Sequence, residues 1–169
     1  GPFALGSHSV AISSNLDGGT LLCEATLTVV DTTAPSVTRK HVEMWPPNHK
    51  FQSIDANDCF EITDACDANI EAVVLWATSD EPLDDTGDGN TEPDIQFAGC
   101  EEVQLRAERK GNGSGRVYRM GWRFTDDSGN STESTCEVLV PHDQGKHEAF
   151  ADPPVVELSN DASCQPDAG

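Results

Sequence analysis

The segment from Asp80 to Asp94 holds the side chains most capable of chemistry in this sequence. Seven of its fifteen residues are carboxylates, and glycines stand at positions 87 and 89. Calcium takes six to eight hard oxygen ligands on a loop that folds around it, and glycine allows the necessary curvature. We therefore predict a calcium site in this segment. Its predicted ligands are Asp80, Asp84, Asp85, Thr86, Asp88, Asn90 and Asp94.

The predicted calcium loop begins like an EF-hand but does not end like one. Asp84 and Asp88 have the spacing of EF-hand ligands, whereas Ile95 stands where the closing glutamate would be. The plain alternative is a solvated hairpin loop rich in aspartate and glycine. Asp64 and Asp67 could add ligands from a neighbouring loop, although aspartates in such positions also form turns without any metal.

Acidic and basic residues are separated along the chain. The sequence has 10 Lys and Arg against 30 Asp and Glu, a formal charge of −20. Fifteen of the acidic residues lie between Lys50 and Arg106, where there is no Lys or Arg, and six of the ten basic residues lie from Arg106 to Arg123. Because a compact block of like charge repels itself, we expect cations and guanidinium groups to neutralise the acidic segment. The arginines expected to clamp it are Arg106, Arg109, Arg116, Arg119 and Arg123. Binding of sulfate or an anionic glycan by these arginines is the alternative, and the surplus negative charge disfavours it.

The sequence gives little support for an enzyme. No G-x-S-x-G or comparable nucleophile context is present. A glycosidase with paired carboxylates would usually have an aromatic-lined cleft, and only 6% of the residues are aromatic. The one hint of self-processing is the chemically labile Asp152–Pro153 bond. We therefore predict that the chain is not an enzyme.

Six cysteines indicate a disulfide framework. They are Cys23, Cys59, Cys66, Cys100, Cys136 and Cys164. No two form a C-x-x-C pair, and an even number in an acidic, strand-rich chain is typical of three disulfides in an oxidising compartment. Six cysteines allow 15 pairings, and the residues alone do not choose among them. We expect Cys164 to be bonded, with Cys23 as its best partner because both lie outside the central part of the chain.

Hydrophobic residues alternate with a period of two, which is typical of half-buried antiparallel strands. Tyr118, Met120, Trp122 and Phe124 share one face of a predicted strand, and polar residues occupy the other. No segment predicts an amphipathic helix longer than a turn or two. Many short strands separated by Gly, Asp, Asn and Pro turns predict an all-β fold, a β-sandwich. The predicted strands lie near 8–12, 21–30, 37–44, 51–54, 59–63, 70–78, 102–109, 116–125 and 136–140.

The composition also predicts the boundaries of three parts. The sequence from Asp31 to Pro35 is an extended joint that ends at a proline. We expect residues 1–34 to form an extra hairpin and residues 35–141 to form the sandwich. Residues 142–169 are acidic, contain prolines and lack periodicity, so we expect an extended linker or tail.

A series of motifs runs through about 100 residues, from 45 to 145. They are WPPNHK, DACD, SDEPLDDTGDGNTEPDIQ, LRAERKGNGSGRVY, DDSGN and VPHDQGK. With these motifs the chain resembles the hyalin-repeat class of immunoglobulin-like modules found in bacterial secreted proteins. Residues 5–35 are similar to the last two strands and the exit linker of one such repeat, and residues 45–145 are similar to a following related module. The resemblance implies an immunoglobulin-like antiparallel sandwich in a large extracellular chain.

The resemblance also implies a disulfide pairing. In such repeats a cysteine after the early acidic turn commonly bonds one in the final strand, which pairs Cys66 with Cys136 and leaves Cys59 with Cys100. Cys23 stands where the final-strand cysteine of a preceding repeat would be, but its usual partner is missing from this sequence.

Together these observations predict a non-catalytic, calcium-stabilised, immunoglobulin-like module for structure or adhesion in a secreted or cell-surface bacterial protein. Its expected partners are neighbouring domains of the same chain, another surface protein or a glycan. Nucleic acid is excluded by the acidic charge, and no apolar run is long enough for a membrane span. The alternatives are a carbohydrate- or peptide-binding sandwich, which solvent-facing tryptophans among Trp45, Trp76 and Trp122 would favour, and a self-processing or hydrolytic fragment.

Overall fold

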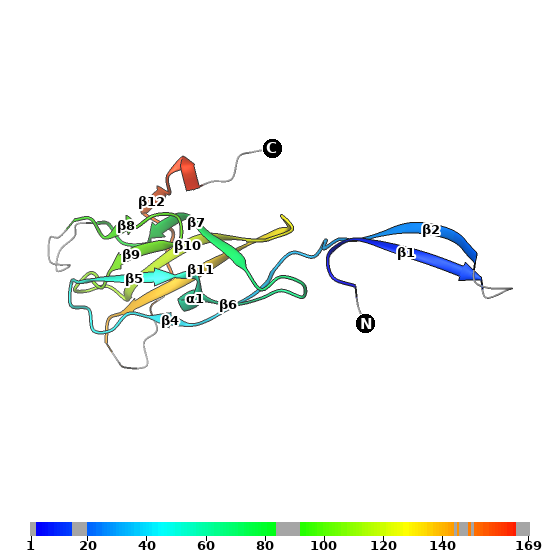
Figure 1. Cartoon of the computed structure of the whole chain (residues 1–169). Helices are drawn as coiled ribbons and strands as arrows, with labels where there is room; N and C mark the ends of the chain where they lie inside the picture. Colours follow the sequence, from blue (N-terminus) through cyan, green and yellow to red (C-terminus); the bar gives the residue numbers. More distant parts are fainter. Residues whose placement is uncertain are drawn as a thin grey trace. The chain divides into compact units, whose positions relative to one another are not determined.

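The computed structural model describes residues 3–14, 20–83, 92–143, 145, 149 and 151–164. The chain divides into two compact units, Gly1–Thr33 and Ala34–Gly169. Nearly all of the regular structure is β-strand, as the sequence predicts (Figure 1). The strands are β1 (Gly6–Ser14), β2 (Thr20–Val29), β3 (Ser36–Arg39), β4 (Val42–Glu43), β5 (Phe51–Asp55), β6 (Phe60–Thr63), β7 (Ile70–Ser79), β8 (Ile95–Phe97), β9 (Glu102–Arg106), β10 (Gly115–Asp126), β11 (Ser131–Pro141) and β12 (Val156–Ser159). The helical turns are α1 (Ala56–Cys59) and η1 (Ala162–Cys164).

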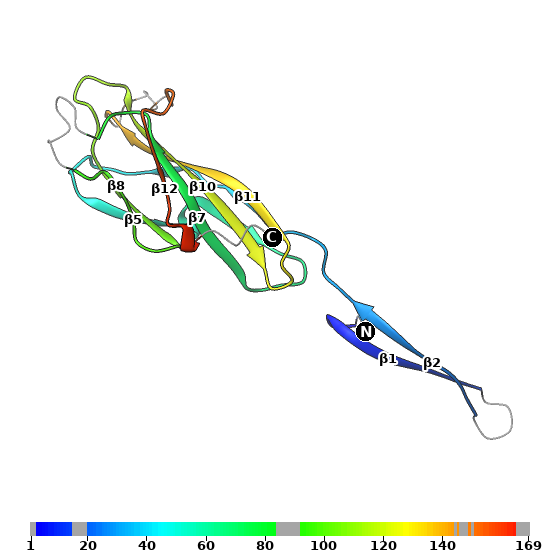
Figure 2. The same cartoon turned by 90° about the horizontal axis from the view of Figure 1, so that it is seen from above.

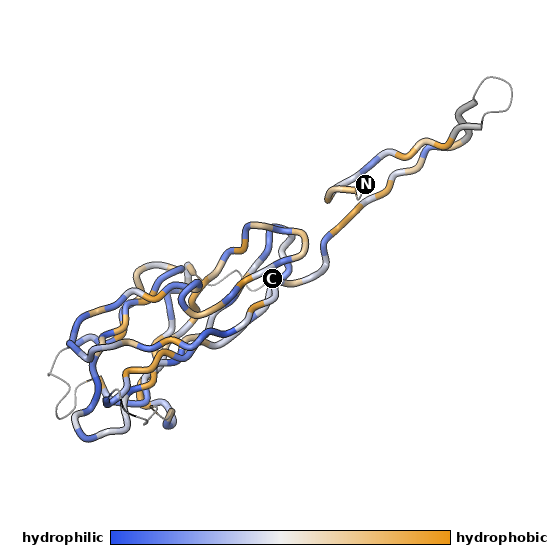
Figure 3. Tube along the Cα trace, turned by 90° about the horizontal axis from the view of Figure 1, so that it is seen from below, coloured by the Kyte–Doolittle hydropathy of each residue, from blue (hydrophilic) through white to orange (hydrophobic). Residues whose placement is uncertain are grey.

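The first unit is an antiparallel hairpin of β1 and β2 whose two faces differ in polarity. Figure 3 shows apolar and hydrophilic residues alternating along both strands. Residues that pair directly across two strands point to the same face of the hairpin. The register therefore gives one face His8, Val10, Ile12, Cys23, Ala25 and Leu27, and the other face Ser7, Ser9, Ala11, Glu24, Thr26 and Thr28. The apolar face is open to solvent, since Ile12 is 59% and Leu27 is 41% exposed.

The second unit is an all-β sandwich built on a five-stranded sheet. The strand order of this main sheet is β12-β7-β10-β11-β4, and only the pair of β11 with β4 is parallel. The predicted inner row of β10 is confirmed, because Tyr118, Met120, Trp122 and Phe124 are all completely buried. A register shift between Gly121 and Trp122 leaves one extra residue in β7 opposite this point.

The opposing layer of the sandwich contains two smaller sheets, β5-β9-β8 and β3-β6. Val103 and Leu105 of β9 are fully buried and belong to the same core as the inner row of β10. Phe60 of β6 meets Phe124 of β10 edge to face, with ring centroids 5.1 Å apart. Alternating apolar residues from both layers therefore close the single core of this unit.

The acidic C-terminal segment is extended, as predicted, and it is fastened to the sandwich. β12 pairs antiparallel with β7, on the side of β7 away from β10 (Figure 2). The Asn160 side-chain amide donates hydrogen bonds to the carbonyl oxygens of Val74 and Gly99, at 2.9 and 3.0 Å. The segment therefore contributes an edge strand to the main sheet, which the sequence pattern did not predict.

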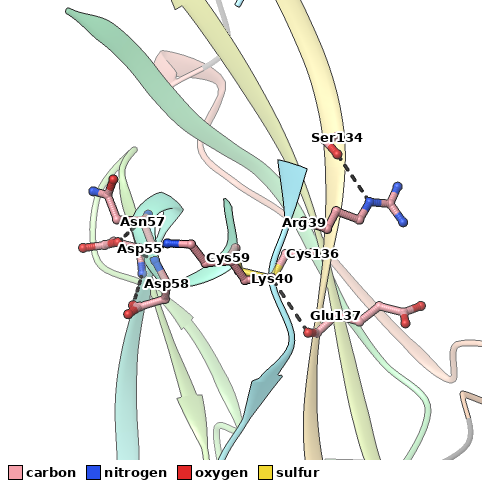
Figure 4. The surroundings of a disulfide bond; sticks show 9 residues. All are labelled: Arg39, Lys40, Asp55, Asn57, Asp58, Cys59, Ser134, Cys136 and Glu137. Atoms are coloured by element: carbon pink, nitrogen blue, oxygen red, sulfur yellow. Dashed lines mark hydrogen bonds between the residues drawn. A yellow bond between two sulfur atoms is a disulfide. The ribbon is translucent and has the colours of Figure 1, made fainter. Parts of the chain in front are cut away.

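The single turn of α1 places a cysteine in the core. Asp55 and Asp58 form a capping box at its start, because each side chain accepts a hydrogen bond from the other's backbone N–H. Cys59 ends the turn, and it is bonded to Cys136 on the inner row of β11 (Figure 4). None of the described helices is long and apolar enough to cross a membrane.

Both disulfides of the described residues differ from the expected pairings. The bonds are Cys59–Cys136 and Cys100–Cys164, so the expected pairs Cys66–Cys136, Cys59–Cys100 and Cys23–Cys164 are wrong. Cys66 is exposed in the turn before β7. That turn lies at the level of Asp126, six residues along β10 from Met120, which pairs with Cys136. At about 3.3 Å per residue the gap is about 20 Å, beyond the reach of about 7 Å between the Cα atoms of a disulfide.

Candidate functional site

Both described ends of the predicted calcium segment lead into the interior of the sandwich. β7 ends at Ser79, opposite Tyr118 of β10, and Asp94, the residue before β8, forms an ion pair with Arg116 of β10, so both ends lie at the start of β10. Charged and polar side chains gather there between the layers. This charged cluster consists of Glu81, Asp94, Arg106, Glu108, Arg116 and Tyr118.

Arg116 is the centre of the charged cluster, and its side chain is completely buried. Its guanidinium forms an ion pair with Asp94, donates to Glu81 at 3.3 Å and donates to the carbonyl oxygen of Pro82 at 2.9 Å. It also donates to the hydroxyl of Tyr118 at 3.0 Å. One side chain therefore holds both described ends of the acidic segment, which a fork of five donors can do.

Arg106 fastens the second end of the segment from the other layer. Its guanidinium donates to the carbonyl oxygen of Pro93 through two nitrogens, at 2.8 and 3.1 Å, and to that of His49 at 3.0 Å. It lies over the ring of Phe51, 4.2 Å from the centroid. Its Nε is 3.5 Å from Asp94 Oδ1. These contacts fix the turn that enters β8.

Asp94 and Glu108 are two fully buried carboxyl groups that contact each other. Burial, followed by the hydrogen bond with Glu108, raises the pKa of Asp94 to about 7, although Arg116 acts in the opposite direction. A hydrogen bond between two carboxyl groups requires a proton on one of them. With Glu81, three carboxyl groups face two guanidiniums, so a proton held by the pair brings the cluster to neutrality.

The surrounding groups complete the hydrogen bonding of the cluster. Tyr118 donates from its hydroxyl to the carbonyl oxygen of Arg106 at 2.9 Å, and burial raises the pKa of this tyrosine. The Nδ1 atom of His49 lies 3.2 Å from Glu108 Oε2, at the edge of the cluster. Because Asp94, Glu108 and Arg116 have no exposed surface, a substrate cannot reach them. The arrangement holds the chain ends, and it raises the pKa of Asp94.

The described residues do not form the predicted calcium site. Five predicted ligands, Asp84, Asp85, Thr86, Asp88 and Asn90, lie outside the described residues, so they stay a prediction. Asp80 accepts hydrogen bonds from the backbone N–H groups of Val117 at 2.8 Å and Asp152 at 3.2 Å, one on each oxygen. Asp94 is buried against two arginines. Both carboxylate oxygens of Asp80 and Oδ2 of Asp94 therefore accept from protein donors.

Asp64 and Asp67 lie at the opposite end of the sandwich, and their expected contribution to the same calcium site is wrong. They precede β7, whereas Asp80 follows it, and ten residues of strand span about 30 Å. Asp64 Oδ1 accepts hydrogen bonds from the backbone of Cys66 at 2.8 Å and Asp67 at 3.0 Å, and these bonds lower the pKa of Asp64. Asp64, the first aspartate of DACD, therefore forms a turn, which is the alternative that the sequence left open.

The five arginines have three separate roles. Arg106 and Arg116 clamp the described ends of the acidic segment, as predicted. Arg119 and Arg123 lie on the outer face of β10, where they pair across the sheet with glutamates of β11 at 2.9 and 2.7 Å. Arg109 donates to the carbonyl oxygen of His142 at 2.8 Å. The expected clamp therefore needs only two of the five.

Sequence reasoning missed Glu81, Glu108 and Tyr118 as members of the cluster. One signal was present, because Arg116 has the same strand parity as Tyr118 and the rest of the buried row of β10. An arginine on an inner row requires buried carboxylates as partners. Glu108 carried no such signal, since it follows the end of β9.

The tryptophans divide between interior and surface. Trp122 is fully buried, Trp45 is 39% exposed, and Trp76 is partly exposed on the main sheet.

Comparisons of the chain with protein-family models, with curated proteins and with solved structures find no match. The fold therefore defines the class of this protein by itself: an all-β sandwich closed by two disulfides and preceded by a β-hairpin.

Proposed function

We propose that the chain is a non-catalytic structural module of a secreted or cell-surface protein. In this proposal the sandwich is a spacer and the hairpin joins it to a neighbouring β domain. The observation that carries it is the complete burial of Asp94, Glu108 and Arg116 in the charged cluster, which holds the ends of β7 and β8. The resemblance of the sequence to hyalin repeats supports an immunoglobulin-like topology and a bacterial extracellular setting.

The cysteines support an oxidising compartment. Cys59 and Cys136 are buried in the core of the sandwich, and Cys100 ties the turn between β8 and β9 to Cys164 beyond β12. Disulfides persist in secreted and surface proteins and are rare in the reducing cytosol. A cross-link over 77 residues also lowers the entropy of the unfolded chain, which suits a module exposed to proteases.

The hairpin supports a junction with another β layer. An isolated two-stranded hairpin is marginally stable in water, and a third strand or a covering layer is normally required. Its apolar face offers Val10, Ile12, Ala25 and Leu27 without a single Lys, Arg, Asp or Glu. A neighbouring domain of the same chain, or another surface protein, would cover this face.

Calcium enters the proposal only through residues 84–91. Chelation with EDTA should lower the melting temperature of the sandwich, and added calcium should restore it, because a ligand that binds only the folded state stabilises it by mass action. An unchanged melting temperature would remove calcium from the proposal and leave the structural role intact.

Removing the hydroxyl of Tyr118 tests the structural role. Tyr118→Phe removes a hydroxyl that donates to the Arg106 carbonyl oxygen and accepts from the buried Arg116 guanidinium, so we expect the free energy of unfolding to fall by about 1–3 kcal/mol. Polar groups kept for catalysis commonly cost stability, and their removal raises it. A more stable variant in urea unfolding would therefore contradict the proposal. Thr125→Val, on the outer face of the same strand, is the matched control and should change stability by less than about 0.5 kcal/mol.

A further inference from the structure

A groove crosses the outer face of the main sheet, on the side away from the core. It has a volume of about 170 Å³ and extends from Trp76 on β7, over Gly121 on β10, to Thr135 on β11. Arg39 of β3 closes its far end. Figure 4 shows Arg39 beside β11, where its Nε donates to the Ser134 hydroxyl at 3.5 Å.

Trp76 lies on this outer face and does not pack into the core. Its register partner is Gly121, whereas the core row of β7 contains Val74 and Ala77, both fully buried. The extra residue of β7 lies between Val74 and Trp76, and such bulges re-aim side chains, frequently beside functional sites. The indole remains partly exposed.

Gly121 gives the indole its position. A Cβ atom at this residue would lie 2.2 Å from Trp76 Nε1 and 2.3 Å from Cε2, so any other residue would displace the ring. The ring therefore lies directly against the main chain of β10. This contact makes Trp76 a rigid aromatic wall of the groove.

The rest of the groove is lined by hydrogen-bonding groups of both kinds. Arg39 offers donors, and Glu133 offers an acceptor whose position is fixed by two hydrogen bonds from Arg123, at 2.7 and 3.0 Å. Trp122 contributes only its backbone here, since its side chain lies on the buried inner row of β10. The charged residues that line the groove itself are one arginine, Arg39, and one glutamate, Glu133, so the charge of its lining is balanced.

We propose that this outer groove binds the ring of a neutral carbohydrate. An aromatic side chain offers an apolar surface to the C–H face of a sugar, while nearby polar groups orient its hydroxyls. Balanced charge disfavours a cation or an anion, and the formal charge of −20 repels polyanions. The site is independent of the proposed spacer role, since it uses the outer face of the sheet and not the charged cluster.

The test is a titration of the whole chain with neutral trisaccharides of glucose, galactose, mannose and N-acetylglucosamine. Tryptophan fluorescence and backbone amide NMR spectra follow the titration to about 10 mM, where weak affinities are measurable. We expect at least one trisaccharide to shift amide signals of β10 and β11 around Gly121 and Thr135. Trp76→Ala should weaken its binding about tenfold or more, and Trp45→Ala, which removes an exposed indole outside the groove, should leave it unchanged.

A second pair of variants keeps the test valid if Trp76→Ala does not fold. Glu133→Gln and Thr135→Val alter groove residues at the sheet surface, and each should weaken trisaccharide binding several-fold with the melting temperature retained. The proposal is overturned if none of the trisaccharides shifts the signals. It is also overturned if the groove variants bind the trisaccharide as tightly as the unmodified chain does. The same holds if the signals respond to peptides and not to sugars.

Discussion

Arginines of the same strand have opposite surroundings in this protein. Arg116 stands on the inner row of β10 and is completely buried, with Asp94 and Glu81 as partners. Arg119 and Arg123, three and seven residues further on, stand on the outer row and pair with exposed glutamates of β11. Whether an arginine of β10 is separated from Arg116 by an odd or an even number of positions therefore decides whether its guanidinium lies in the core or on the outer face.

Burial therefore decides how much the loss of one partner of an ion pair lowers the stability of the fold. In the charged cluster, losing one partner leaves other charges without water or a counter-charge. On the outer face, water replaces a lost partner, so exposed pairs contribute little. The buried arginine holds strand ends together, whereas the exposed arginines mainly shape the sheet surface beside the outer groove.

The largest effect is expected from Arg116→Met. This change leaves Asp94 and Glu81 buried without their guanidinium, so the free energy of unfolding should fall by about 3–5 kcal/mol, measured by urea denaturation. Adding Asp94→Leu to the same chain should recover part of the loss, because it removes one of the stranded charges. A loss below about 1 kcal/mol for the single variant would mean that the cluster does not support the fold.

The next effect concerns pH. The raised pKa of Asp94 means that the folded chain holds a proton which the unfolded chain releases above its ordinary pKa of 3.8. This contribution to stability is present at low pH and is lost as the pH rises towards about 7, with a slope of at most about 1.4 kcal/mol per pH unit. Urea denaturation between pH 4 and pH 8 should show this slope in the unmodified chain. Asp94→Asn, which cannot titrate, should lack it, and equal slopes in both chains would refute the shared proton.

A smaller effect is expected from Arg106→Lys. Lysine keeps the charge near Asp94 but loses the fork that holds the Pro93 carbonyl oxygen with two nitrogens. We expect a loss of about 1–2 kcal/mol in urea denaturation. Arg109→Lys is the matched control because Arg109 lies outside the charged cluster, and it should lose less. A larger loss of stability for Arg109→Lys than for Arg106→Lys would show that charge alone fixes the entry to β8.

The smallest effects are expected on the outer face. Arg119→Met and Arg123→Met remove exposed pairs, so each should cost less than about 1 kcal/mol, and added salt should reduce even that difference. Thermal unfolding at low and high salt measures both quantities. A loss as large as that of Arg116→Met would erase the distinction between the two rows.

Much of the fold could be read from local pattern. The alternation around Tyr118 to Phe124 predicted the inner row of β10, and the outward position of Arg119 followed from the same parity. Pairing between distant segments could not be read in this way. β12 joins the edge of β7 through only four residues, whose alternation is too short to indicate a partner strand, and the turn of α1 brings Cys59 to Cys136 across the core.

The sequence by itself determined the strand-rich class, the faces of the long strands and the need to neutralise a dense acidic segment, because these depend on residue type and on a period of two. Only the tertiary structure decided which arginines neutralise it, which cysteines meet, and that Asp94 and Glu108 are buried in contact with each other. Those outcomes depend on which strand ends come together and on how far water is excluded there. Both are properties of the folded layers, and neither is contained in the order of neighbouring residues.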